Sequence, residues 1–214
     1  MSGLRPTTRR TVPGSTVAAL LLVLTGCSGD DDPAPTPTPE VASTPALADV
    51  APGAVTVARG SFCDAVPDAA VEAALDGPAE SSRSWDNGDA VAVAGGSDVA
   101  HEHGCAWRGA APAAAEAWVF APPVTTERAR AVARAEGRRP GCRPLPDAAP
   151  FGEPGAALLC RSPGDDGALV ASYRGLFGDA WLTCEVQAGP GTDEADLAAR
   201  ADRWCAAVLG AAGG

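Results

Sequence analysis

The positions of seven cysteines constrain the fold of this 214-residue chain more than any other feature of its sequence. Cys27 stands alone near the N-terminus, and the other six follow between residues 63 and 205. An even number of cysteines in an exported domain indicates disulfides, here three of them. Six cysteines can pair in many ways, and the sequence alone does not choose. We expect the pairs that keep loops short and join neighbouring elements: Cys63–Cys105, Cys142–Cys160 and Cys184–Cys205.

The N-terminal residues have the pattern of an export signal. Arg5, Arg9 and Arg10 precede an apolar run over residues 17–24, which is much shorter than the roughly 20 residues of a membrane-spanning helix. The run ends in L-T-G-C at residues 24–27, which resembles the bacterial lipobox. We therefore expect residues 1–26 to be a lipoprotein signal peptide and the lipidated Cys27 to anchor the protein to the extracytoplasmic face of the cell membrane. The alternatives are an ordinary secretory leader with a chance cysteine and, for the route, general secretion or twin-arginine export.

The segment that follows Cys27 is predicted to be a disordered tether. Residues 27–60 are rich in Pro, Thr and Asp, and their prolines lack backbone donors, so we expect no packed structure before about Val55. The acidic run at residues 30–32 is interpreted as solvated rather than as a cation site, and glycosylation of the Thr-Pro repeats is left open. The disulfide-containing domain is therefore expected over residues 61–211.

The charged residues exclude several classes of function. Three of the 16 basic residues lie in the leader, which leaves 13 against 27 acidic residues and a net charge of −14. This balance argues against nucleic acid and against electrostatic docking on anionic lipid. Every basic residue is Arg, so the chain lacks the Lys that phosphate-binding loops, Schiff-base enzymes and Ser-Lys enzymes require. No cofactor is expected.

Hydrophobic periodicity and turn residues predict a mixed fold. Helices are expected over residues 66–77, 125–137 and 192–210, and strands over residues 105–108, 117–120, 156–160, 168–176 and 180–187, with a further candidate at 90–94. The order α-β-β-α-β-β-β-α, with a tight turn at residues 164–167 and another at 178–179, implies consecutive hairpins. We predict an α+β fold: an antiparallel sheet of about five strands with helices on one face, stapled by disulfides.

Short motifs along the domain resemble a known family. Cys63 is followed by V-P-D-A-A-V-E-A-A-L-D-G at residues 66–77, G-C-A-W stands at residues 104–107, and F-G-E-P-G-A-A stands at residues 151–157. This pattern resembles small actinobacterial cell-envelope lipoproteins of unknown function, over most of residues 61–210. The resemblance implies an α+β domain and no established reaction. The chain departs from that pattern by Asp76 before Gly77 and by four cysteines beyond the first pair.

Candidate chemical groups are few, and each has a structural interpretation. His101, Glu102 and His103 beside Cys105 could form a metal cluster, but an oxidised Cys105 is no thiolate ligand, and we expect no metal. The chain has no G-x-S-x-G motif and no Ser, His and acid at a recognisable spacing. The pair at residues 165–166 suits a turn, and Arg138 with Arg139 suits a helix C-terminus. The chain is therefore not expected to be an enzyme.

Tryptophans dominate the aromatic residues, with five Trp against one Tyr. Trp107, Trp181 and Trp204 fall on predicted elements and are expected in the core. Trp85 falls in a polar stretch, where it would contact a ligand or fold over the sheet.

Three functions remain open at this point. The first is a non-catalytic binding or interaction domain that holds a lipid, a glycan or an envelope protein. The second is a structural or accessory subunit of an envelope complex, and the third is a hydrolase with an unfamiliar site. A cavity of several hundred Å³ favours the first, a flat apolar patch the second, and a cleft residue with a perturbed pKa the third.

Overall fold

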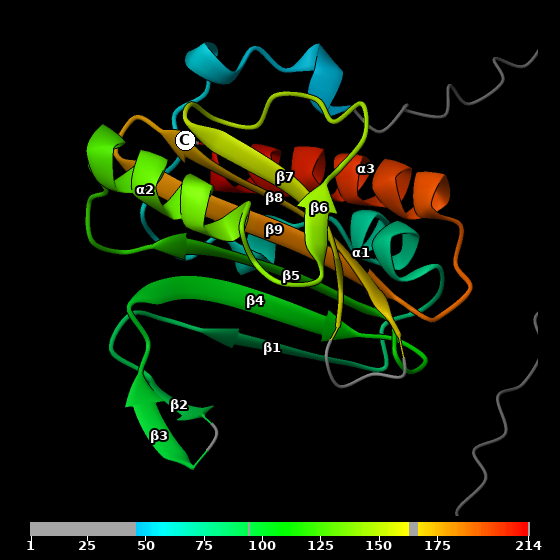
Figure 1. Ribbon diagram of the computed structural model, residues 1–214. Helices are drawn as coiled ribbons and strands as arrows, with labels where there is room; N and C mark the ends of the chain where they lie inside the picture. Colours follow the sequence, from blue (N-terminus) through cyan, green and yellow to red (C-terminus); the bar gives the residue numbers. More distant parts are fainter. Residues whose placement is uncertain (1–45, 94, 163–166, 214) are drawn as a thin grey trace, which may run out of the picture. The chain divides into compact units, whose positions relative to one another are not determined.

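The structure, a computed structural model, describes residues 46–213 except residues 94 and 163–166 (Figure 1). The predicted signal peptide, Cys27 and the first part of the predicted tether lie outside the described residues, as does most of the predicted turn at residues 164–167. The chain divides into two units, and the second, from Ala42 to Gly214, contains all three disulfides and the whole described core. Among the described helices, none is long and apolar enough to span a bilayer.

A seven-stranded antiparallel sheet forms the framework of this unit. Its spatial order is β1-β4-β5-β9-β8-β7-β6, and the strands are β1 (Ser81–Trp85), β4 (Glu102–Arg108), β5 (Ala114–Phe120), β6 (Cys142–Pro144), β7 (Gly155–Arg161), β8 (Leu169–Phe177) and β9 (Ala180–Ala188). A separate hairpin joins β2 (Ala90–Val93) to β3 (Gly96–Val99). The predicted α+β class and antiparallel sheet are confirmed. The expected count of about five strands is wrong, because polar edge strands were missed.

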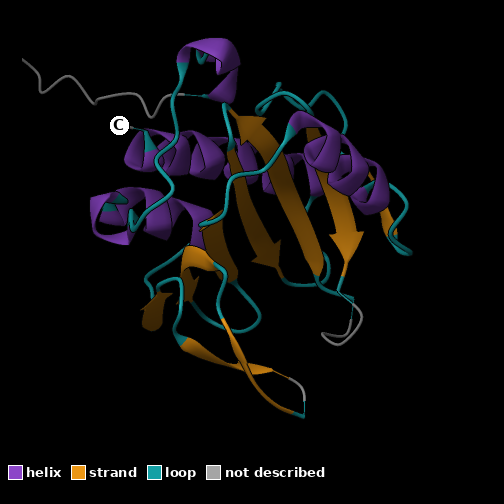
Figure 2. Cartoon of the chain, turned by 90° about the vertical axis from the view of Figure 1, so that its left-hand side faces the viewer, coloured by secondary structure: helices purple, strands orange, loops and turns teal. Residues whose placement is uncertain are grey.

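Helices cover both faces of the sheet (Figure 2). The helices α1 (Asp68–Leu75) and α3 (Glu194–Ala212) lie on one face, where alternate residues of β9, namely Leu182, Cys184 and Val186, are fully buried beneath them. The helix α2 (Thr126–Glu136) packs on the opposite face, where Ala129 contacts Leu176 and Trp181 in a second apolar cluster. The expectation that helices cover only one face therefore holds for α1 and α3 and is wrong for α2.

The helix ends follow capping chemistry. The Thr125 side chain accepts the backbone N–H of Arg128 and starts α2, as predicted. Asp193 caps α3, because its carboxylate accepts the backbone N–H groups of both Ala195 and Asp196, so the helix begins slightly after the predicted residue 192. The helix also continues past Gly210 to Ala212, since the neighbouring Leu209 and Ala212 are buried in the core.

The three disulfides join the pairs that were predicted. Cys63–Cys105 ties the short 3-10 helix η3 (Cys63–Ala65) to β4, Cys142–Cys160 ties β6 to β7, and Cys184–Cys205 ties β9 to α3. Their Cα–Cα distances are 5.8, 4.0 and 5.6 Å respectively. The last pair crosses the main core and fixes α3 on the sheet.

Residues before Ser61 also belong to the folded unit. Leu47 in the 3-10 helix η1 (Leu47–Asp49) is only 1% exposed, and Val57 forms a bridge with Gly213 beyond the end of α3. A second 3-10 turn, η2 (Pro52–Ala54), connects them. The expectations that packing starts at about Val55 and that the tether runs to residue 60 are therefore wrong. The burial of Leu47 and Val57 depends on α3 and the residues just after it, and the local sequence pattern does not show these contacts.

Candidate functional site

A groove with a mostly apolar lining runs along one side of α3. Its volume is about 720 Å³, within the range of ligand sites in proteins. The groove is lined by residues of α3, of β8, of the loop after β6 and of the N-terminal segment: Ala46, Pro146, Asp147, Tyr173, Glu194, Ala195, Ala198, Ala199, Asp202 and Arg203.

Small residues on α3 create the floor of this groove. Ala195, Ala198, Ala199 and Asp202 recur at helical spacing and share one side of the helix, next to the apolar stripe that faces the sheet. Because methyl groups do not fill the space that longer side chains would occupy, a channel remains between α3 and the segments beside it. Seven residues of helix separate Ala195 from Asp202, which corresponds to about 10 Å.

Two segments form the walls of the groove. The N-terminal segment is held on α3 by the backbone N–H of Leu47, which donates to Asp202 Oδ2 at 3.2 Å. The opposite wall is the loop that contains Pro146 and Asp147, and Asp147 adopts a left-handed backbone conformation with φ of 51°. At the end of the groove, Arg143 forms an ion pair with Glu194 and links β6 to the start of α3.

Tyr173 of β8 reaches the groove from beneath α3. The residue is only 2% exposed, and its ring packs edge to face on Phe151 with a centroid distance of 5.8 Å. Within the described part of the chain, its hydroxyl has no hydrogen-bond partner. Burial, and secondarily the Asp202 carboxylate, raises the pKa of Tyr173 to about 12. The phenol therefore stays protonated at neutral pH and can both donate and accept a hydrogen bond.

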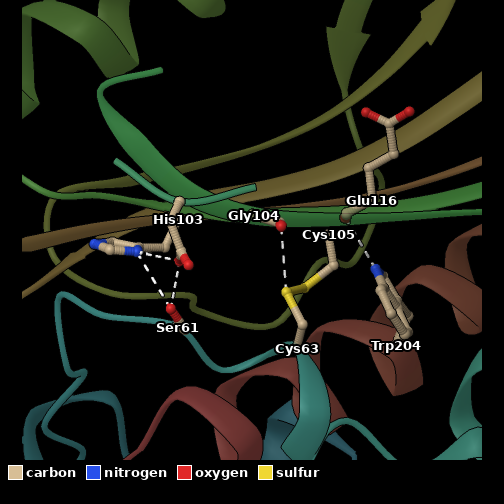
Figure 3. The surroundings of a disulfide bond; sticks show 8 residues. Ser61, Cys63, His103, Gly104, Cys105, Glu116 and Trp204 are labelled. Atoms are coloured by element: carbon tan, nitrogen blue, oxygen red, sulfur yellow. Dashed lines mark hydrogen bonds and ion pairs between the residues drawn. A yellow bond between two sulfur atoms is a disulfide. The ribbon is translucent and has the colours of Figure 1, made fainter. Parts of the chain in front are cut away.

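A Ser, a His and an Asp meet at a second place, beside the Cys63–Cys105 disulfide (Figure 3). His103 Nδ1 lies 2.7 Å from Asp86 Oδ1 and 3.4 Å from Ser61 Oγ, and the Ser61 hydroxyl donates to the same Asp86 oxygen. The hydrogen bonds from His103 and Ser61 lower the pKa of the exposed Asp86. The sequence spacing gave no sign of this cluster, because its members come from three different segments.

The geometry of this cluster differs from a catalytic triad. A triad requires the acid on one imidazole nitrogen and the nucleophile on the other, so that a proton can pass between them. Here Ser61 and Asp86 share the Nδ1 side of His103, and the Ser61 hydroxyl already donates to the carboxylate. The arrangement ties the N-terminal segment and the turn after β1 to β4, and it does not activate the serine.

A third polar cluster lies between α2 and the sheet. Arg174 of β8 pairs with Glu136 of α2 and, at 3.4 Å, with Glu185 of β9. Burial raises the pKa of Glu185, and the buried Ser172 hydroxyl has no hydrogen-bond partner among the described residues. These strand residues lie on the face of the sheet opposite Tyr173 and Cys184, so they do not line the α3 groove.

Comparison of the sequence with protein-family models and with curated proteins found no match. The resemblance to actinobacterial lipoproteins therefore stays a prediction.

The residues singled out in the sequence are dispersed over the structure. His101 is exposed before β4, His103 contacts Asp86, and Cys105 is in a disulfide. Within the described ranges, no three His, Cys, Asp or Glu side chains come close enough to hold a metal ion. Arg139 pairs with Glu136 just after α2.

The tryptophans are distributed between the core and the sheet surface. Trp181 and Trp204 are buried as predicted, and Trp107 packs edge to face on Trp204 at 5.4 Å while remaining partly exposed. Trp85 lies in β1, where its ring covers Gly104 and its indole N–H donates to Glu102 at 3.3 Å. Of the two interpretations of Trp85, this contact corresponds to folding over the sheet.

Neither Tyr173 nor the alanines of α3 were predicted from the sequence to line a site. A usable signal was present, because α3 carries small residues at positions 195, 198 and 199 beside its apolar stripe. That signal does not reveal a groove, however, since the walls come from Ala46 and from residues 146–147, which are distant from α3 in the sequence.

Proposed function

We propose that this chain is a lipoprotein, anchored by Cys27 on the extracytoplasmic face of the membrane, whose folded domain is a non-catalytic binding module. The observation that carries the proposal is the α3 groove, with a volume of about 720 Å³ and the hydroxyl of a buried tyrosine in its wall. A lipid-like ligand suits it better than a glycan, because the groove surface is mostly apolar and alanine and proline supply five of its ten lining residues.

The two alternative functions have less support. An accessory subunit would bury a flat apolar patch, but among the described residues Val99 is the one large hydrophobic side chain with high exposure, at 48%. A hydrolase would need an activated nucleophile or a general base with a matched pKa. The pKa of Asp86 is lowered, which makes its carboxylate a weaker base, and Glu185 lies beneath α2.

Native mass spectrometry of the protein purified from its own envelope tests the binding function. We expect a bound small molecule of constant mass, retained in wild type and lost from Ala199→Leu, which fills the groove from an exposed helical position. Ala73→Leu is the matched control, because Ala73 is also an exposed alanine on a helix and lies outside the groove. A bare chain in all three preparations, or equal occupancy in Ala199→Leu, contradicts the proposal.

Fractionation of cells that express Cys27→Ser tests the anchor independently. The variant should leave the membrane fraction, because two acyl chains supply the stable attachment. Its oxidised domain should remain folded, since all three disulfides lie elsewhere. Retention of the variant in the membrane fraction contradicts the lipid anchor and leaves the binding function untouched.

A further inference from the structure

We propose that the α3 groove binds an amphiphile that has an unbranched aliphatic chain and a cationic head group. This inference rests on the proposed binding function and adds the chemical class of the ligand. Three features of the groove support it: the shape of its apolar floor, the Tyr173 hydroxyl that lines it and the charges on its rim.

The floor of the groove favours a narrow aliphatic chain over a ring system. The helix contributes only methyl groups at positions 195, 198 and 199, and Pro146 adds a further apolar surface from the opposite wall. No large side chain of α3 divides the channel over the roughly 10 Å between Ala195 and Asp202. Buried methylene groups contribute about 0.8 kcal/mol each, so a chain laid along this surface provides most of the affinity.

The polar end of the site is the Tyr173 hydroxyl next to Asp202. The hydroxyl lines the groove and has no hydrogen-bond partner among the described protein groups, so it is available to a ligand group. The phenol oxygen can accept a hydrogen bond from an ammonium group, and the neighbouring carboxylate of Asp202 compensates the positive charge. A carboxylate head group at the same place would instead be repelled by Asp202.

The rim of the groove carries excess negative charge. Asp147, Glu194 and Asp202 face a single cation, Arg203, among the lining residues. Arg143 neutralises Glu194 from outside the groove, and the Asp147 carboxylate has no ion-pair or hydrogen-bond partner among the described residues. The local field therefore favours a cation near Asp147 and Asp202, in agreement with the net charge of −11 for the whole chain.

Three ligands with the same ten-carbon chain separate the contribution of the head group from that of the chain. Decylamine, decanol and decanoate are titrated below their micelle concentrations into residues 42–214, the unit that contains the whole described core and every disulfide. Isothermal calorimetry at pH 7 and low salt should show one decylamine per chain, bound about tenfold or more tightly than decanoate. Decanol should fall between them, and added salt should weaken decylamine alone.

Two pairs of variants locate the binding on the protein. Ala199→Leu should abolish decylamine binding, whereas Ala73→Leu should leave it unchanged. Asp147→Asn should weaken decylamine about two- to fivefold, as expected for one partly solvated charge. Asp76→Asn is its matched control, because Asp76 and Asp147 are the two non-glycine residues with positive φ in the described chain, and asparagine tolerates that conformation. Tyr173→Phe, which keeps the ring and removes the hydroxyl, should also weaken decylamine.

The outcomes distinguish this inference from the proposed function. If decanoate binds at least as tightly as decylamine and Ala199→Leu abolishes its binding, the groove is a ligand site but the cationic head group is wrong. If Asp147→Asn and Asp76→Asn weaken decylamine equally, the amine responds to the general acidity of the protein and the inference is also wrong. If none of the three ligands binds, or Ala199→Leu has no effect, the apolar groove itself has failed as a ligand site.

Discussion

Removing the Cys184–Cys205 disulfide provides a quantitative test of what fixes α3 on the sheet. The two cysteines are 21 residues apart, and closing a loop of this length in the unfolded chain corresponds to about 3.3 kcal/mol in the chain-entropy model. Both residues are fully buried, so replacing them with alanine also removes two packed sulfur atoms, at a cost of about 1–2 kcal/mol. The Cys184→Ala/Cys205→Ala variant should therefore lose about 4–5 kcal/mol of unfolding free energy.

The Cys142–Cys160 disulfide supplies a matched comparison. Its separation of 18 residues gives nearly the same loop term, about 3.2 kcal/mol. Because Cys142 is partly exposed on the edge strand β6, its sulfur loses less packing. The Cys142→Ala/Cys160→Ala variant should consequently retain about 1 kcal/mol more stability than the central variant.

Urea unfolding followed by far-ultraviolet circular dichroism and by tryptophan fluorescence measures both losses. Circular dichroism follows secondary structure and fluorescence follows the packing around tryptophans such as the buried Trp181 and Trp204, so coincident transitions also test two-state behaviour. A loss below about 1 kcal/mol in the central variant would refute the loop term. An equal or larger loss in the edge variant would refute the argument from burial.

Three further perturbations test other parts of the fold. Burial raises the pKa of Glu185, so the Glu185 carboxyl binds a proton more tightly in the native state than in the unfolded state. The free energy of unfolding should therefore fall as pH rises from the pKa of the unfolded state through the raised pKa of the native state. Glu185→Gln should flatten this part of a urea-stability profile measured between pH 4 and 8. Gly104→Ala places a methyl group 2.3 Å from the Trp85 ring and should cost about 1–3 kcal/mol in urea unfolding, with recovery in the double variant that also carries Trp85→Ala. The guanidinium of Arg200 donates two hydrogen bonds to the Ala74 carbonyl, at 2.6 and 3.1 Å, and Arg200→Met removes both. Calorimetric unfolding should show a loss of about 2 kcal/mol in the free energy of unfolding. A loss below about 0.5 kcal/mol would mean that water replaces the guanidinium at this carbonyl.

The elements that the sequence predicted well are those that bury many apolar side chains. The central strands β8 and β9 are buried along most of their length, and α3 has one buried face, so their apolar residues form a run or recur at the period of a helix. β1 has the sequence S-S-R-S-W and four exposed residues, because it is an edge strand whose hydrogen bonds come from β4 alone. Strand formation there depends on the partner, and a partner is not visible in local periodicity.

The positions of α2 and of the N-terminal segment depended on tertiary contacts in the same way. Only Ala129 of α2 is fully buried, so the helix has no broad apolar stripe that would indicate which face of the sheet it covers. Leu47 is an isolated apolar residue after a Pro-rich stretch, and its burial requires α3 as a neighbour. Both cases involve one or two side chains, which is too few for a pattern to specify.

The groove arises from the same dependence on tertiary contacts. Tyr173 lies on a correctly predicted strand, and its alternation places it on the face beneath α3 with Ala171. A tyrosine at such a position usually satisfies its hydroxyl within the protein or at the surface. Here the small residues of α3 leave the hydroxyl facing a channel, and the walls of that channel come from the N-terminal segment and the loop after β6.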